Sequence, residues 1–262
     1  MLVLKLLLTP AIMVGATLAG RRYGRLATGW LVGLPLTSGP INVFFAVEHG
    51  PHFAGRAAVG SLSGAIGEVA FCGGYAALAR RGWPWAVGAG SAGFALVALL
   101  VEELHLTAAP EVVIGVAAAA VVALFAGLQL IPHVPPAFEA TAVAPSRWDL
   151  PARAVTATGV LLALTALATT LGPRLSGLLA VYPLYTVVLA VFAQRQEGRS
   201  GAIQIMRGLL VGLFSFAAFY ATLALALGRI DTAPAYVLSF AAAFVVQVVT
   251  LRPLLRLAAA AR

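Results

Sequence analysis

The sequence predicts an all-α polytopic membrane protein whose nine transmembrane helices form a 4+1+4 inverted repeat. Three observations lead to this fold class. Of the 262 residues, 61% are hydrophobic and only 10% are charged, whereas a soluble domain carries about 25% charged residues. Apolar segments of about 20 residues, long enough to cross a bilayer, follow one another along the chain. The third observation is an internal repeat, which aligns the second half of the chain with the first.

The expected spans are continuous apolar runs that contain few charges. They cover residues 1–20, 26–47, 56–79, 84–101, 112–131, 152–172, 175–194, 204–228 and 233–251. The first run is expected to be a signal-anchor, because Arg21 and Arg22 follow it, whereas the charges of a cleaved signal peptide precede its apolar run.

The net charge of +8 is explained by membrane topology and gives no support to nucleic-acid binding. With nine spans the loops sort onto two sides, and one of these sides receives only Lys5, Arg56, Arg174 and Arg229. Lys and Arg gather in cytoplasmic loops. We therefore expect a multi-pass protein of the cell inner (plasma) membrane, with its N-terminus outside and its C-terminus in the cytoplasm.

A shift of 148 residues aligns the two halves of the chain without a gap, and we call the residues that it aligns counterparts. The identical pairs include Gly24/Gly172, Gly29/Gly177, Pro35/Pro183, Leu36/Leu184, Phe44/Phe192, Gly50/Gly198, Gly60/Gly208, Gly64/Gly212 and Phe71/Phe219. The repeat divides the chain into a first four-helix unit at 1–105, a linking helix with a Pro-rich cytoplasmic linker at 106–151, and a second unit at 152–262. The single linking span turns the second unit upside down.

Inverted repeats can exchange conformations, which is the physical basis of alternating access. In this respect the chain resembles small secondary transporters with inverted repeats and broken crossing helices, the group that includes bile-acid-type symporters and Na⁺/H⁺ antiporters. The resemblance rests on architecture, because the chain lacks the paired carboxylates of the antiporters. It implies a transported small-molecule or ion substrate and a site near the middle of the membrane.

Residues 31–45, LVGLPLTSGPINVFF, interrupt an apolar run with prolines, hydroxyls and an amide. Proline removes a backbone donor and clashes with the carbonyl one turn earlier. Unwound backbone is tolerated at membrane depth only where protein buries it or a water-filled cavity meets it. We therefore expect a break at Pro35, extended by Gly39 and Pro40, that faces the interior, and a matching break at Pro183.

Polar groups near the two breaks are the candidates for a substrate or ion pathway. They are Thr37, Ser38 and Asn42 near Pro35, and Tyr185 and Thr186 near Pro183. Hydroxyls, amides and freed backbone carbonyls can coordinate a small polar solute or a cation. The alternative is that each proline merely kinks a helix.

Glu68 lies at the centre of the expected span 56–79, where a charge costs about 3 kcal/mol or more. Intramembrane carboxyls usually face the bundle interior and belong to ion or proton pathways. We expect Glu68 to be neutral at rest and to release its proton when water reaches it. The alternative is a protonated Glu68 that hydrogen-bonds to a neighbouring helix. The nearby Gly60 and Gly64, like Gly208 and Gly212, are expected to allow close helix packing.

Lys5 and Arg153 are counterparts in the first turns of their spans. They are expected either to snorkel to the headgroups or to guard the two mouths of one pathway and attract an anion. Glu48, His49 and His52 could hold a metal ion, but no fourth ligand is evident nearby, and we expect no metal site.

The sequence contains no P-loop, HExxH, GxSxG or CxxC pattern, so we expect no enzyme and no cofactor. The function expected is secondary transport of a small solute, coupled to a proton or another ion. The expected partners are this substrate and the lipid bilayer, a homo-oligomer is left open, and nucleic acid is not among the partners. The alternatives are a permease subunit of a multi-component transporter, or a membrane-embedded enzyme or assembly factor without transport.

Overall fold

A computed structural model describes residues 2–36, 38–104, 106–134, 148–180 and 182–259; in 2–6, 8, 164–165, 167–180 and 252–259 it describes the backbone only. These residues form helices and connecting turns, with no strand among them. The helices are α1 (Leu2–Tyr23), α2 (Arg25–Val32), α3 (Ser38–His49), α4 (Pro51–Leu78), α5 (Trp83–Glu103), α6 (Pro110–Leu130), α7 (Asp149–Ala180), α8 (Leu184–Ala226) and α9 (Thr232–Ala259), with a short 3-10 helix η1 (Ala79–Arg81).

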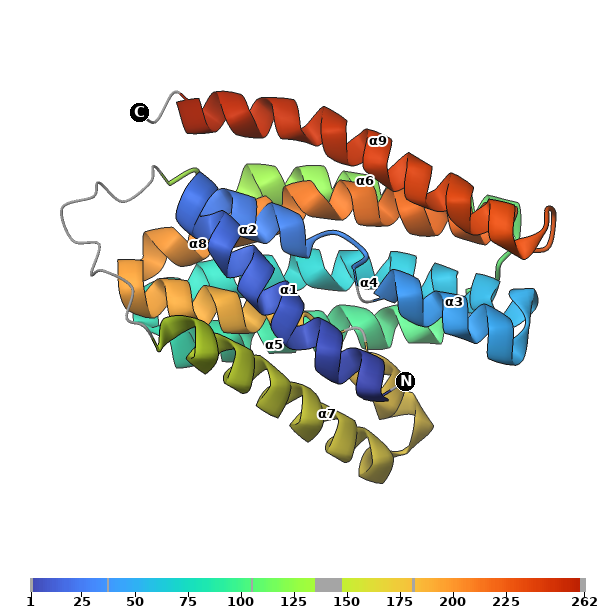
Figure 1. Cartoon of the computed structure of the whole chain (residues 1–262), viewed down its shortest axis with the longest axis horizontal. Helices are drawn as coiled ribbons and strands as arrows, with labels where there is room; N and C mark the ends of the chain where they lie inside the picture. Colours follow the sequence, from blue (N-terminus) through green and yellow to red (C-terminus); the bar gives the residue numbers. More distant parts are fainter. Residues whose placement is uncertain (1, 37, 105, 135–147, 181, 260–262) are drawn as a thin grey trace.

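Figure 1 shows the long helices packed roughly side by side along one axis of the molecule. The end of α1, the beginnings of α2 and α7 and the middle of α8 all lie at the left end of the view. The turn between α3 and α4 and the turn between α8 and α9 lie at the right end.

Two glycines reverse the chain between consecutive helical segments. Gly50 separates α3 from α4 with a φ of 85°, and Gly198 divides α8 into two parts with a φ of 70°. Positive φ is strained for residues that carry a Cβ, so glycine is the residue that permits these sharp reversals. Gly50 and Gly198 are counterparts, and the segments after them, α4 and the second part of α8, run in opposite directions (Figure 1).

Within the described part of the chain, five helical segments are long and apolar enough to cross a membrane. They are Pro51–Arg81, Trp83–Glu103, Pro110–Leu130, Leu184–Ala226 and Thr232–Leu251. The protein is therefore an all-helical chain with several segments suited to a bilayer.

Two expectations about helix boundaries are corrected. Gly39 and Pro40 were expected to extend the first break, but α3 already begins at Ser38 and includes both. Proline is tolerated in the first turn of a helix because its missing N–H would have no intrahelical partner there. A turn was also expected between 172 and 175, but α7 continues to Ala180, and the second break falls after it.

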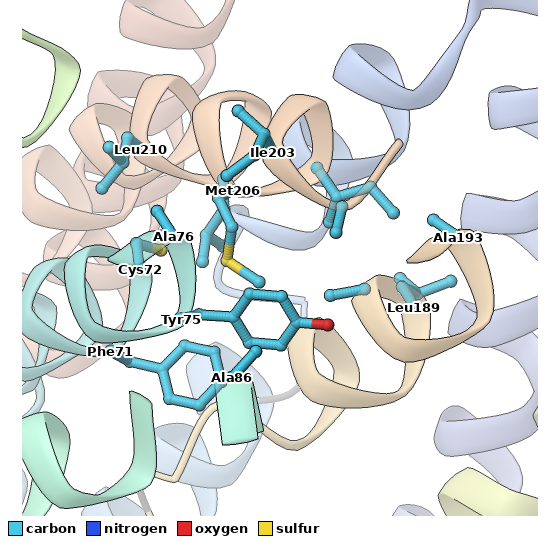
Figure 2. Packing of buried hydrophobic residues seen from close by; sticks show 14 of the residues in the cluster. Phe71, Cys72, Tyr75, Ala76, Ala86, Leu189, Ala193, Ile203, Met206 and Leu210 are labelled. Carbon is cyan, nitrogen blue, oxygen red and sulfur yellow. The ribbon is translucent and has the colours of Figure 1, made fainter. Parts of the chain in front are cut away.

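The buried apolar side chains that the structure describes form two clusters, which follow one another along the length of α4 and of the second part of α8. The first contains Phe71, Cys72 and Tyr75 of α4 and buried apolar residues of α8 between Leu184 and Leu213. Figure 2 shows Tyr75 of this cluster among Phe71, Met206 and Leu189. The second cluster contains α4 residues up to Leu62 and α8 residues from Ala217 onward. Glu68 of α4 lies between the two levels.

Candidate functional site

The two predicted helix breaks are present, and the same type of backbone hydrogen bond spans the proline at each of them. Leu36 N–H donates to the Leu34 carbonyl oxygen across Pro35, and Leu184 N–H donates to the Tyr182 carbonyl oxygen across Pro183, each over 2.7 Å. These are γ-turns around proline, whose restricted φ suits this geometry. Pro183 has φ −74° and ψ 57°, as expected for an inverse γ-turn.

The helices resume directly after each turn. Gly39 N–H donates to the Pro35 carbonyl oxygen and Val187 N–H donates to the Pro183 carbonyl oxygen, both over 3.0 Å. Gly39 and Leu184, near the starts of α3 and α8, are both buried. Helix N-termini carry a partial positive charge, which attracts negative groups and the polar atoms of a ligand.

Glu68 lies on the face of α4 that is turned to α8. Residues seven apart share one face of a helix, which places Ser61, Glu68 and Tyr75 in one row. At one end of this row the Tyr75 hydroxyl donates to Gln194 Oε1 in the first part of α8, over 2.7 Å. At the other end the Ser61 hydroxyl lies beside that of Tyr220 in the second part of α8. Glu68 is seven residues, or about 10 Å along α4, from both Ser61 and Tyr75.

Both breaks reach this face of α4. Tyr182, which precedes Pro183, packs edge-on against Phe71, with 6.2 Å between ring centroids, and Phe71 is one turn after Glu68. Ser38, the first residue of α3, lies beside the Tyr220 hydroxyl, as Ser61 does. The two breaks therefore meet α4 on either side of Glu68 along the helix.

The carboxyl of Glu68 is partly buried and has no ion-pair or hydrogen-bond partner among the described residues. The expected alternative, a protonated Glu68 that hydrogen-bonds to a neighbouring helix, is therefore not seen in this part of the chain. An intramembrane carboxyl without a partner is costly to keep, which is why such groups usually serve a function.

A second polar group beside the first break is also without a hydrogen bond. Tyr220 is fully buried, and its hydroxyl faces those of Ser38 and Ser61 but makes no hydrogen bond of standard geometry to either. A buried hydroxyl without a partner is unfavourable and is commonly satisfied by water or by a ligand. Ser61 and Tyr220 were not among the site residues predicted from the sequence.

Other predicted site residues are committed to packing between helices. Asn42 is 2% exposed, donates to the Ala54 carbonyl oxygen over 3.3 Å and accepts from the Tyr236 hydroxyl. The Tyr185 hydroxyl lies 2.9 Å from that of Thr9 in α1. Thr186 is also buried. Thr37 lies outside the described residues, and for Lys5 the structure describes the backbone only.

Arg153 is not at an open mouth but is 1% exposed inside a polar network. Its Nε donates to Asp149 Oδ1 over 3.0 Å, and its Nη2 donates to Gln196 Oε1 over 2.9 Å. Arg21 of α1 donates to Asp149 Oδ2 over 3.1 Å. The guanidinium of Arg153 also lies over the Phe192 ring, 4.9 Å from its centroid.

Arg25, at the start of α2, completes this network. It donates to Glu197 Oε1 over 2.7 Å and to Gln196 Oε1 over 3.1 Å. We call the whole set the arginine network: Arg21, Arg25, Asp149, Arg153, Gln196 and Glu197. It ties α1, α2, α7 and α8 together at the left end of Figure 1, which we call the network end.

The network lowers the pKa of the Asp149 carboxyl. Burial by itself raises this pKa, but hydrogen bonds from Arg153, Gln196 and Arg21, together with the positive charge of Arg153, outweigh that effect. Asp149 is therefore ionised at neutral pH. The spacing of Asp149 and Arg153 along α7 could have suggested this pair from the sequence, whereas no local signal connects them to Gln196 or Arg21.

Comparison with known proteins gives no further information, because no protein-family model, curated protein or solved structure matches the chain.

Proposed function

We propose that the chain is a secondary transporter that moves a small solute across the inner membrane by alternating access. In this proposal the substrate or ion site lies between the two helix breaks, and Glu68 couples transport by taking up and releasing a proton. The nine spans form two four-helix units of opposite orientation around one linking helix, with the N-terminus outside and the C-terminus in the cytoplasm.

The observation that carries the proposal is the position of Glu68. A carboxyl without an ion-pair or hydrogen-bond partner in the described chain lies on the α4 face that both breaks approach. The helix N-termini that begin at these breaks favour negative charge. Protonated Glu68 is suited to the membrane interior, and its ionised form needs water or a cation beside it.

The inverted repeat is supported by detailed agreement between counterparts. The two γ-turns at Pro35 and Pro183 have matching hydrogen bonds, and Gly50 and Gly198 make matching reversals. Leu78, which ends α4, is the counterpart of Ala226, which ends α8. Opposed halves of similar structure can exchange conformations at low cost, which is what alternating access requires.

The test is a proton-flux assay on the purified chain in proteoliposomes that contain a pH-sensitive dye. Imposed gradients of Na⁺, K⁺ and a set of organic cations and anions are applied in turn. We expect at least one gradient to move protons in wild-type vesicles and not in Glu68→Gln vesicles. If Glu68→Gln moves protons as the wild type does, Glu68 is not the coupling group.

The same assay separates the alternatives. A permease subunit needs its ATPase or binding partner, so the purified chain would be inactive with every gradient but active once the native membrane components are added back. An enzyme or assembly factor would move no solute in either setting. Either result would contradict the proposal that the chain transports by itself.

A further inference from the structure

Counterpart glycines in the two halves have unequal surroundings. Gly208 in α8 is buried, and a Cβ at this position would lie 2.0 Å from the carbonyl oxygen of Leu26 in α2. Its counterpart Gly60 in α4 is exposed, and nothing lies within 4 Å of a Cβ built there. Helix α2 of the first half therefore packs on α8 of the second half, whereas no described residue packs on Gly60, the counterpart position in α4.

The difference extends to the neighbouring residues. Leu209, beside α2, is 1% exposed, whereas its counterpart Ser61 is partly exposed. Gln196 is held in the arginine network at the network end, whereas its counterpart Glu48, at the opposite end of the molecule, is exposed. Polar contacts therefore join the helices at the network end, whereas Glu48 makes no such contact among the described residues at the other end.

Gly60 has no packing reason to be glycine in this arrangement. A glycine inside a helix is less favourable than alanine, and there is free space for a methyl group here. Gly208, in contrast, is required because the α2 backbone touches it. A second arrangement in which a helix packs on Gly60 would give Gly60 the same role.

We propose that α4 carries a second docking site, at Gly60, for the segment 173–180 of α7, which is the counterpart of α2. This inference rests on the proposed function. When 173–180 packs on α4, α2 leaves Gly208 and Gly212, and the arginine network opens. Glu48 and His49, the counterparts of Gln196 and Glu197, then make the corresponding polar contacts at the other end of the molecule. The structure is the state that is closed at the network end.

The test follows two reporter cysteines that are counterparts of each other. Cys72 is replaced by alanine to remove the chain's single cysteine, and Ser61→Cys or Leu209→Cys is then introduced. Each variant is labelled with a membrane-impermeant maleimide from either side of oriented vesicles. We expect Ser61→Cys to react from the side opposite the network end, and Leu209→Cys to react about tenfold more slowly from the network side.

Weakening the network should reverse this pattern. Asp149→Asn removes the charge that holds Arg21 and Arg153, so we expect labelling of Leu209→Cys to rise and labelling of Ser61→Cys to fall. A rise at Leu209→Cys without a fall at Ser61→Cys would mean that the bundle has only loosened, and it would overturn the proposal. Unchanged labelling at both positions would overturn it as well.

A second variant tests the docking site without touching the network. Gly60→Leu fits the present structure but fills the space that 173–180 would need, so labelling of Leu209→Cys should fall below that of its parent. Gly115→Leu is the matched control, because Gly115 of α6 is also exposed with nothing within 4 Å of its Cβ position. Equal labelling with Gly60→Leu and Gly115→Leu would overturn the docking site.

These results can be separated from the failure of the proposed function. If labelling rises at Leu209→Cys and falls at Ser61→Cys in a chain that moves no protons, the exchange of conformations is supported and proton coupling is rejected. Proton flux that depends on Glu68, without reciprocal labelling, would keep the transporter and reject the docking site on α4.

Discussion

The Tyr236 hydroxyl of α9 lies 2.6 Å from the side-chain oxygen of Asn42 in α3 and 2.7 Å from its backbone oxygen. Asn42 also contacts α4, because its side-chain amide donates to the Ala54 carbonyl oxygen. One buried amide thus joins three helices just after the first break. Asn42 therefore fixes the beginning of α3 in place beside Tyr220.

Tyr236→Phe should destabilise the protein by about 1–3 kcal/mol, because it leaves a buried Asn42 oxygen without a donor. Tyr220→Phe is the matched control: it removes a buried hydroxyl that makes no hydrogen bond of standard geometry, so we expect little loss. Thermal unfolding in detergent measures both variants. A loss from Tyr220→Phe as large as that from Tyr236→Phe would contradict this assignment.

Gly208→Ala should destabilise the fold, whereas Gly60→Ala should leave it intact or stabilise it slightly. The added methyl group at Gly208 meets the backbone of α2, and overpacking of this kind costs about 1–3 kcal/mol or more. At Gly60 alanine meets open space and improves helix propensity. The comparison is made by thermal unfolding, and equal destabilisation by the two substitutions would contradict the packing described for α2.

Arg153→Met should cost about 3–5 kcal/mol, because it leaves the buried carboxylate of Asp149 with weaker compensation. Arg22→Met is the control, because Arg22 is exposed next to the network and takes no part in it. Unfolding of the two variants in detergent measures the difference. A loss of stability with Arg153→Met no greater than that with Arg22→Met would show that the network contributes nothing to the fold.

The free energy of unfolding should fall on acidification, because Asp149 becomes protonated. Its native pKa is lower than its ordinary value of 3.8, so the unfolded chain takes up the proton first as the pH falls. The contribution of Asp149 is therefore fully present above that ordinary value, and it disappears as the pH falls through the lower native pKa. Unfolding measured from neutral pH to about pH 3 should show this loss in the wild type and less of it in Asp149→Asn.

The sequence predicted the helical class and both breaks because these depend on local chemistry. Apolar runs determine which segments suit a membrane, and Pro35 and Pro183 interrupt a helix wherever they lie in its interior. The exact extent of each break was not predictable in the same way. Pro40 was expected to widen the first break, but its position in the first turn of α3 makes it compatible with a helix.

The sequence did not reveal which polar groups are free and which are engaged. Asn42 was expected to coordinate a ligand, whereas Tyr236, far along the chain, occupies its side-chain oxygen. Arg153 was expected at a mouth or at the headgroups, whereas it is buried and donates to Gln196, 43 residues further along the chain. Such partners come from distant segments, so only the packed structure brings them together.

The central claim is that Glu68 exchanges a proton inside the membrane. A hydrophobic carbodiimide, which modifies protonated carboxyls, tests this claim without knowledge of the substrate. The modified peptides are identified by mass spectrometry after reaction in native membranes over a series of pH values, with Glu68→Gln as the blank. We predict that Glu68 is modified and that its modification decreases as the pH rises. A Glu68 that stays unmodified at every pH in the folded chain, or that reacts equally at every pH, would contradict the account.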